Sequence, residues 1–324
     1  MPKFTYEMAE CLPFRDAQVF ERVRRIKRAD ICRHPNKNFQ IEVIEDQAAF
    51  GFAYVLDIVA GIRRSLEAGR RYVIILPAPN PQYAWVAEMI NRLGISCKHV
   101  HTFNMDEYAD QDGRTAPRDW KGGFQYWMWR DLFGRIDPKL RMPEKQIHFP
   151  DTRNIDRYSR MIEDLGGADV CYGGIGWSGH IAFFEPHLGV PFVNDLEGYL
   201  EQGARIVDLH PITIMQSTVY CDNGRSGDWS YVPPKAYTIG PRDLKNSKLV
   251  SFWNTGYAGG GFAWQRFITR LAAHGPVTPL VPASILQVLR SELILLGAVA
   301  DNYDWNVPLR QDPMPWDGGH PWPK

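Results

Sequence analysis

The sequence of 324 residues has no excess of charge of either sign. Lysine plus arginine and aspartate plus glutamate number 37 each, so the formal net charge is zero. A chain without a basic field has no long-range electrostatic attraction for nucleic acid or for anionic lipid. We therefore expect neither nucleic acid nor a membrane as a partner.

Cysteine is scarce as well, with five residues that are widely spaced and form no Cys-x-x-Cys pair. A disulfide framework or a zinc ribbon would need such pairs, so reduced thiols are favoured. The charged N-terminus lacks the apolar run of a signal peptide, and no stretch reaches the roughly 18 apolar residues of a membrane span. The sequence therefore predicts a cytoplasmic protein.

Hydrophobic periodicity alternates between helical and strand patterns along the chain, which contains no internal repeat. Apolar residues at every fourth position between Asp46 and Arg70 predict an amphipathic helix, and the apolar run of 71–77 predicts a strand buried on both faces. Further strands are predicted near 98–104, 168–173, 236–239 and 249–254, and further helices near 81–93, 119–133, 155–165, 262–273 and 283–289. This alternation favours an α/β fold with a parallel sheet wrapped by helices.

Residues 173–186, which we call the glycine loop, follow the strand predicted at 168–173. Their glycines leave room for a backbone to approach a small ligand and permit positive φ. His180 supplies a group that exchanges protons near neutral pH, and Glu185 could orient it or share its proton. The pattern predicts an active-site loop.

Two other predicted strand ends carry polar groups, at 76–81 and at 103–108. Ligands of open α/β sheets collect at the carboxyl ends of strands, so these segments and the glycine loop are expected to share one crevice. Asp106 could then act as a general base, while His180 and Glu185 handle a hydroxyl proton. Two separate proton-transfer groups suit enolisation of a sugar.

Two segments resemble the signatures of the glucosamine-6-phosphate deaminase/isomerase family, in order and in separation. These are FNMDEY at 103–108 and GGIGWSGHIAFFEP at 173–186, and the resemblance extends over roughly residues 46–300 through VPPKAYTIG at 232–240. It implies a three-layer α/β fold with a Rossmann-like parallel sheet and helices on both faces. It also implies a small-molecule sugar substrate, a homo-oligomer, and no metal or organic cofactor.

The same resemblance implies roles for individual residues. Asp106 would move a proton between C1 and C2 of the sugar, and His180 would assist ring opening with support from Glu185. Ser178 would complete the catalytic set, at the position where the family carries an aspartate two residues before the histidine, and Phe184 replaces the usual asparagine. The substrate-binding positions would be Ala78, Asn80, Gly174, Gly176, Gly179 and Gly256.

The departures from the family concern charge. Ser178 can hydrogen-bond, but it cannot stabilise an imidazolium by charge. The resemblance implies three phosphate contacts: a glycine- and threonine-bearing turn after the first strand, a lysine after a later strand, and an arginine. Here the turn carries two prolines without N–H groups, residues 254–261 contain no lysine, and the arginine expected near Val219 is missing. A phosphodianion would lose several charge-assisted bonds there, each contributing about 1.5–3 kcal/mol. We hypothesise that the substrate carries no phosphate at the family's position, or binds it differently.

Other patterns have simpler interpretations. His99 and His101 alternate on one predicted strand, but no third metal ligand stands at a suitable spacing, so a structural role is expected. The aromatic residues of 120–129 could form a sugar-stacking wall, a helix core or an oligomer contact. The Gly-Trp-Ser-Gly of 176–179 is no nucleophile elbow, because the position that needs glycine is His180.

The sequence as a whole predicts an enzyme that transfers a proton between the aldose and ketose forms of an amino sugar or hexose, with or without ammonia release. The alternatives are a lactonase-type hydrolase on the same fold and a non-catalytic sugar-binding sensor. We expect an N-terminal extension over 1–45 packed on the core and one catalytic domain over 46–300. A Pro- and Trp-rich tail over 301–324 completes the chain.

Overall fold

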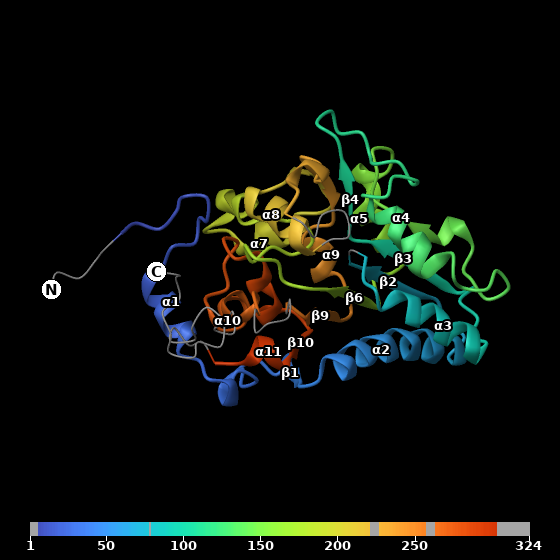
Figure 1. Cartoon of the computed structure of the whole chain (residues 1–324), viewed down its shortest axis with the longest axis horizontal. Coiled ribbons are helices and arrows are strands. Elements are labelled where there is room, and N and C mark those ends of the chain that lie inside the picture. The colour runs from blue at the N-terminus through green and yellow to red at the C-terminus, as the bar shows by residue number, and fades with distance from the viewer. Residues whose placement is uncertain (1–5, 78, 221–226, 257–262, 303–324) are drawn as a thin grey trace, which may run out of the picture.

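The computed structural model describes residues 6–77, 79–220, 227–256 and 263–302. Seven parallel strands form its main sheet, in the order β1-β10-β9-β6-β2-β3-β5 (Figure 1). A second sheet of three antiparallel strands has the order β4-β8-β7. The strands are β1 Phe39–Ile44, β2 Tyr72–Leu76, β3 Val100–Asn104, β4 Asp106–Ala109, β5 Ile147–His148, β6 Val170–Gly173, β7 Arg205–Asp208, β8 Lys235–Thr238, β9 Val250–Asn254 and β10 Ser291–Leu296.

Helices of very different length surround the sheets. The α-helices are α1 Ala17–Arg24, α2 Gln47–Glu67, α3 Tyr83–Leu93, α4 Phe124–Met128, α5 Ile155–Glu163, α6 Pro186–Gly189, α7 Leu196–Leu200, α8 Pro211–Tyr220, α9 Pro241–Lys245, α10 Arg266–His274 and α11 Gly297–Ala300. A π-helix, η2 Trp129–Phe133, continues α4. The 3-10 helices are η1 Arg28–Asp30, η3 Glu144–Gln146, η4 Val190–Phe192, η5 Trp229–Tyr231 and η6 Pro282–Val288.

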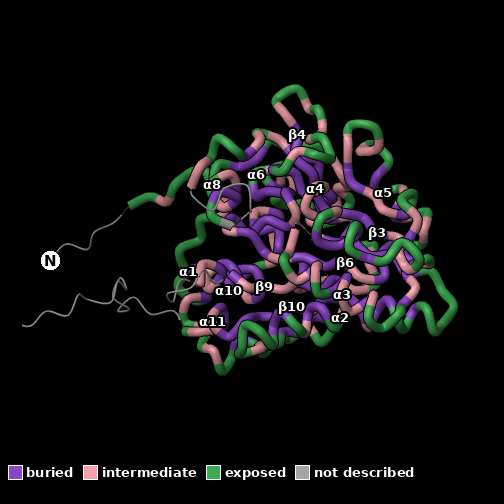
Figure 2. Tube along the Cα trace, turned by 45° about the vertical axis from the view of Figure 1, so that its right-hand side comes forward, coloured by how far each residue is buried: buried purple, intermediate pink, exposed green. Residues whose placement is uncertain are grey.

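Strand β2 shows why the main sheet is covered on both faces. All five of its residues are buried, as the apolar run predicts. Tyr72, Ile74 and Leu76 belong to a core cluster with α2, α3 and η2, whereas Val73 and Ile75 belong to a larger cluster with α1, α5 and α10. Because successive side chains of a strand point to opposite faces, the two clusters are the two sides of one sheet. Figure 2 shows the buried strands between partly exposed helices.

The predicted α/β fold with three layers is confirmed, and several element bounds differ from the prediction. The helix expected over 119–133 begins at Phe124, and residues 282–288 form a 3-10 helix in place of an α-helix. Residues 39–44, within the predicted N-terminal extension, form strand β1, which pairs with β10 at the edge of the sheet. The division into domains stays a prediction, and residues 303–324 of the tail lie outside the described residues.

The small antiparallel sheet was not predicted, and it determines where the acidic segment lies. Strand β3 ends at Asn104, and after one residue the chain enters β4. That one residue, Met105, donates its N–H to Leu76 of the main sheet and accepts from the N–H of Ile239 beyond β8. Asp106 therefore lies within a strand of the second sheet, directly opposite Thr238, and not in a turn after the first sheet.

Candidate active site

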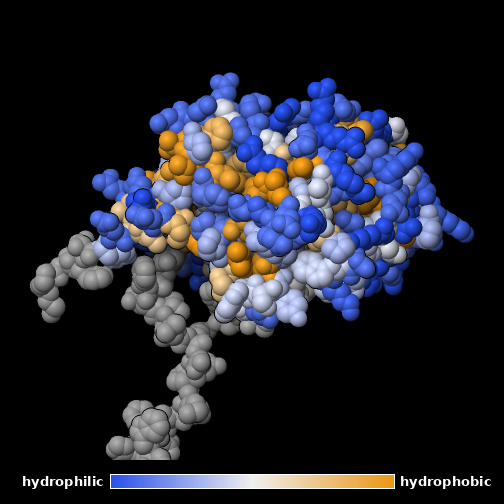
Figure 3. Space-filling view, turned by 90° about the horizontal axis from the view of Figure 1, so that it is seen from above, coloured by the Kyte–Doolittle hydropathy of each residue, from blue (hydrophilic) through white to orange (hydrophobic). Residues whose placement is uncertain are grey.

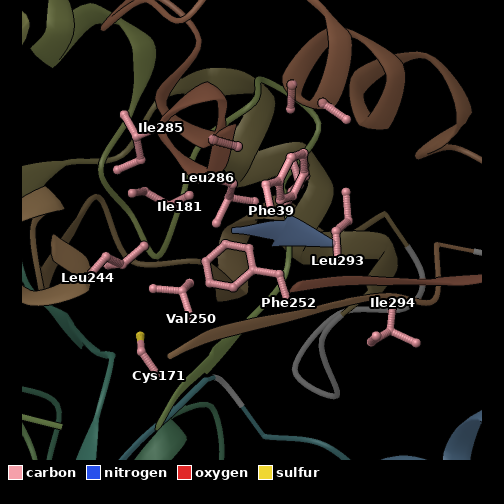
Figure 4. Packing of buried hydrophobic residues seen from close by; sticks show 14 of the residues in the cluster. Phe39, Cys171, Ile181, Leu244, Val250, Phe252, Ile285, Leu286, Leu293 and Ile294 are labelled. Atoms are coloured by element: carbon pink, nitrogen blue, oxygen red, sulfur yellow. The ribbon is translucent and has the colours of Figure 1, made fainter. Parts of the chain in front are cut away.

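The glycine loop leaves β6 at Gly173 and is anchored in the protein core. Ile181 is fully buried in the main core cluster, together with Phe252 and Ile285 (Figure 4). The loop also folds back on itself, since the N–H of Gly176 donates to the carbonyl of His180 at 3.1 Å. A buried side chain and an internal backbone bond fix the loop, so the polar groups on it are held in place.

Two of the loop's glycines are required by space and by backbone conformation. A Cβ atom at Gly176 would lie 2.0 Å from Nε2 of His180, so the imidazole is seated directly against this glycine. Gly179 has φ of +87°, in the region that glycine adopts without steric cost. The first glycine makes room for the histidine, and the second turns the chain so that His180 can occupy that room.

His180 lies at the centre of a buried polar cluster, which we call the His180 cluster: Ser178, His180, Glu185 and Thr213. Its Nδ1 atom is 2.9 Å from Oγ of Ser178, 3.0 Å from Oγ1 of Thr213 and 3.3 Å from Oε2 of Glu185. The Ser178 hydroxyl donates to the same Glu185 oxygen at 2.9 Å. Among the described residues no hydrogen bond engages Nε2 of His180. The geometry thus orients the ring through its Nδ1 atom.

Glu185 supplies the negative charge that Ser178 lacks. Burial by itself would raise the pKa of this fully buried carboxyl, but the charge of His180 and hydrogen bonds from His180, Thr213 and Ser178 together lower it. The carboxylate form is therefore favoured, and its Oε2 atom lies within ion-pair distance of the imidazole. The loss of an acid at position 178 leaves the His180 cluster with one carboxylate.

Asp106 is a second buried acid, carried by β4. Its Oδ1 atom accepts a hydrogen bond of 2.6 Å from Oγ1 of Thr238 on the neighbouring strand β8. Burial raises the pKa of Asp106 to about 7, against the opposing effects of the Thr238 hydrogen bond, the His180 charge and the Phe183 N–H. A carboxyl with a pKa near neutrality can both take up and return a proton, as a general base requires. Oγ1 of Thr238 also accepts the N–H of Phe183 at 2.9 Å, so a single hydroxyl connects Asp106 with the glycine loop.

Glu107, the other acid of this segment, has a structural position. Its two carboxylate oxygens accept the N–H groups of Tyr108, Phe124 and Gln125 at 2.7–3.0 Å, so the side chain caps the first turn of α4. Burial raises its pKa to about 7, with these three hydrogen bonds opposing the rise. Alternation along the strand therefore separates the capping acid Glu107 from Asp106, whose carboxyl bonds to Thr238.

The remaining predicted binding residues are spread over the neighbouring strand ends. Oδ1 of Asn80 accepts the N–H of Gln82 just before α3, and Gly174 lies against the carbonyl of Trp253 at the end of β9. Gly256 donates its N–H to Gln265. Ala78 lies outside the described residues. A substrate-binding role for these positions stays a prediction.

Thr213 and Thr238 contact the predicted site residues, but the sequence did not single them out. Thr213 comes from α8 and reaches His180 across 33 positions of sequence, and Thr238 reaches Asp106 across 132. Hydroxyls of this kind carry no local signature. Only Thr238 lay in a segment with a family resemblance, the VPPKAYTIG of 232–240.

The aromatic residues near α4 have two different surroundings. Phe124 packs with Tyr108 and Phe183 in a small core under the antiparallel sheet, next to the glycine loop. Trp127 and Trp129 lie farther along and stack against guanidinium groups, at 3.6 Å from Arg130 and 3.9 Å from Arg118. The helix-core interpretation therefore fits Phe124.

No three His, Cys, Asp or Glu side chains of the described residues come together as a metal site would require. In the same residues no helix has both the length and the apolar character of a membrane span.

Solved structures of known proteins share this fold. A solved monomeric glucosamine-6-phosphate deaminase superposes with a TM-score of 0.65 at 20% identity and covers 80% of this chain and 98% of its own. A 6-phosphogluconolactonase from Thermotoga maritima superposes with a TM-score of 0.55 at 19% identity and covers 80% of this chain and 99% of its own. The fold is thus one on which both a deaminase and a lactonase are built.

Sequence comparison is more specific. Glucosamine-6-phosphate deaminase of Caenorhabditis elegans is 32% identical over 218 residues, which are 64% of this chain and 72% of the relative. The deaminase of Bacillus velezensis is 31% identical over 233 residues, which are 70% of this chain and 84% of the relative. No family model matches the chain. The chain belongs to the glucosamine-6-phosphate deaminase family, as a divergent member, and it is an enzyme of the sugar isomerase/deaminase class.

Proposed function

We propose that this enzyme transfers a proton between C1 and C2 of an amino sugar or hexose, with Asp106 as the base that acts on carbon. The observation that carries the proposal is the pairing of two separate proton-transfer groups. One is a buried carboxyl with a pKa near 7, and the other is a histidine oriented by a carboxylate through a serine hydroxyl. Aldose–ketose interconversion needs one group for a proton on carbon and another for protons on oxygen.

The proposed reaction begins with ring opening. Nε2 of His180 takes the proton of the C1 hydroxyl and delivers a proton to the ring oxygen, while Glu185 stabilises the imidazolium from the Nδ1 side. Asp106 then removes the C2 proton of the open aldose, and the enediol-type intermediate regains this proton at C1. With a hydroxyl at C2 the product is a ketose. With an amino group at C2 the resulting imine is hydrolysed by water, which gives the ketose and ammonia.

We also propose that the substrate carries no phosphate at the family's position. Neutral carboxamide side chains occupy backbone N–H groups at the strand ends, where an anion would need free donors. The three pairs are Ile175 N–H with Oδ1 of Asn254 at 3.1 Å, Trp177 N–H with Oε1 of Gln216 at 2.7 Å, and Gly256 N–H with Oε1 of Gln265 at 2.6 Å. This arrangement supports a sugar without a phosphate at this position, because a phosphate would have to displace these amides.

A substrate panel tests the proposal. Glucosamine, glucosamine 6-phosphate, glucose and glucose 6-phosphate are each incubated with the purified chain, and ketose and ammonia are measured. We expect turnover with an unphosphorylated sugar and a kcat/KM at least as high as with its 6-phosphate. A strong preference for the phosphate would refute the phosphate-free site. A 6-phosphogluconolactone arm completes the panel, because hydrolysis of the lactone without sugar turnover would establish the lactonase alternative. Tight binding without any turnover would establish a sensor.

The assembly and the cellular location of the chain are further proposals. Family membership supports a homo-oligomer that acts in the cytoplasm, although the solved relative with the TM-score of 0.65 is described as monomeric. Apolar side chains gather in patches on the face shown in Figure 3. Met215 and Val219 of α8 are exposed apolar residues that an oligomer contact would bury. Sedimentation of the full chain distinguishes an oligomer from a monomer.

A further inference from the structure

Thr238 occupies a position that joins the proposed base to the glycine loop. The residue is fully buried on β8, directly opposite Asp106 of β4. Its Oγ1 atom donates to Oδ1 of Asp106 at 2.6 Å and accepts the N–H of Phe183 at 2.9 Å. Phe183 follows Ala182, whose φ of +53° is uncommon for a residue with a Cβ atom. One hydroxyl therefore holds the carboxyl and a strained segment of the loop.

The same hydroxyl can satisfy Asp106 in both of its protonation states. The carbonyl of Ile239 lies 3.2 Å from Oγ1 as a second acceptor. When Asp106 is ionised, Thr238 donates to the carboxylate. When Asp106 carries the substrate proton, the hydroxyl can donate to Ile239 and accept from Asp106, so the carboxyl keeps its place throughout.

We propose that Thr238 is a positioning residue, whose hydroxyl holds the Asp106 carboxyl in place for proton transfer and ties it to the glycine loop through Phe183. This inference rests on the proposed function, since it assigns Thr238 to the base of that reaction. Thr238 acts through Asp106 and is given no contact with the substrate.

Other groups also act on Asp106, and the test must allow for them. His180 of the glycine loop and Glu107 of the same strand contribute charge, while Tyr158 of α5 and Cys171 of β6 lie close enough to interact. Burial raises the pKa of both the tyrosine and the cysteine, which are therefore neutral at the pH of the assay. Substitutions at Thr238 leave all four groups unchanged.

The test is the pH dependence of kcat/KM in two variants, on a substrate that the panel identifies. Thr238→Val removes the hydroxyl and keeps the shape, whereas Thr238→Ser keeps the hydroxyl. Without the Thr238 hydroxyl the ionised form of Asp106 loses a hydrogen bond, so the pKa of Asp106 should rise. The acid limb of the kcat/KM profile should then move to higher pH by about one unit, which is a tenfold change in the deprotonated fraction on that limb. We expect kcat to fall with little change in KM, and Thr238→Ser to restore the limb.

Thr102→Val is the matched control. Thr102 of β3 is also a fully buried threonine, but its Oγ1 has no hydrogen-bond partner within the described part of the chain. This variant should keep the wild-type profile. A Thr238→Val profile that coincides with that of Thr102→Val would overturn the inference.

Asp106→Asn separates this inference from the proposed function. If Asp106→Asn retains turnover, the proposed function itself fails. If Asp106→Asn is inactive and Thr238→Val keeps both kcat and the acid limb, only the role of Thr238 is wrong. Should Thr238→Val not fold, Thr238→Ala provides the same test. The pKa of Asp106 is then measured directly, from the pH dependence of its carboxyl carbon shift in NMR spectra.

Discussion

Replacing Ser178 with alanine tests how the His180 cluster works. The serine hydroxyl lies 2.9 Å from Nδ1 of His180 and donates to Oε2 of Glu185 at 2.9 Å, and all three residues are buried. In the variant, Glu185 loses a donor while its Oε1 atom already lacks a partner among the described residues. Hydrogen bonds to a charged group contribute about 1.5–3 kcal/mol each, and each 1.36 kcal/mol is a factor of ten in rate.

We therefore expect Ser178→Ala to lower kcat/KM by roughly 10- to 150-fold and the free energy of unfolding by about 1.5–3 kcal/mol. The loss in stability should be larger at pH 7 than at pH 4. Glu185 has a lowered pKa, so the stability that its interactions contribute is present above its unfolded value of 4.5 and is lost as the pH falls below it. Urea denaturation at the two pH values and steady-state kinetics measure these effects.

Ser65→Ala provides the matched control for that variant. Ser65 is a fully buried serine whose hydroxyl is 2.8 Å from Nε2 of another histidine, His99, far from the glycine loop in sequence. Its loss should reduce stability without reducing kcat/KM. The reasoning is refuted if Ser178→Ala keeps wild-type kcat/KM, or if Ser65→Ala impairs catalysis equally.

Three further predictions concern the site and its surroundings. Gly176→Ala adds a methyl group whose carbon would lie 2.0 Å from Nε2 of His180, so the ring must turn away. Kinetics should then show a loss of about 100-fold or more, with an unchanged circular dichroism spectrum. Glu107→Gln should weaken the cap of α4 and reduce the free energy of unfolding by about 1–3 kcal/mol. The variant should still retain most of kcat, and denaturation with parallel kinetics checks both parts. Burial raises the pKa of Asp106 from the ordinary value of 3.8 to about 7, so its contribution to stability is present below pH 3.8 and is lost as the pH rises through 7. Unfolding measured at pH 5 and pH 8 should therefore show a smaller loss of stability with rising pH in Asp106→Asn than in the wild type.

The sequence predicted the parts of the fold that long, regular patterns determine. The segment 46–70, in which apolar residues recur at every fourth position, contains α2, and the apolar run of 71–77 contains β2. Of the small antiparallel sheet only β8 was predicted, near 236–239, whereas β4 and β7 have four residues each and lack a distinct period. Strand β1 was missed because its alternating pattern lies in a segment rich in charge.

The candidate site was only partly predictable for a related reason. Residues of the glycine loop are close in sequence, so the neighbourhood of Ser178, His180 and Glu185 follows from one motif. The hydroxyls of Thr213 and Thr238 reach the site from other elements, and their roles depend on strand register and helix docking. The sequence shows that position 178 carries no charge, but it could not show how close Glu185 lies to Nδ1 of His180.

The central claim is that Asp106 moves the proton between carbons. The most direct test follows solvent deuterium into C1 or C2 of the sugar in wild type and in Asp106→Asn, with sugar ring opening measured in parallel. We predict that the variant loses carbon exchange by about 100- to 10,000-fold, while His180 still catalyses ring opening. Carbon exchange at the wild-type rate in a folded Asp106→Asn protein would contradict this account.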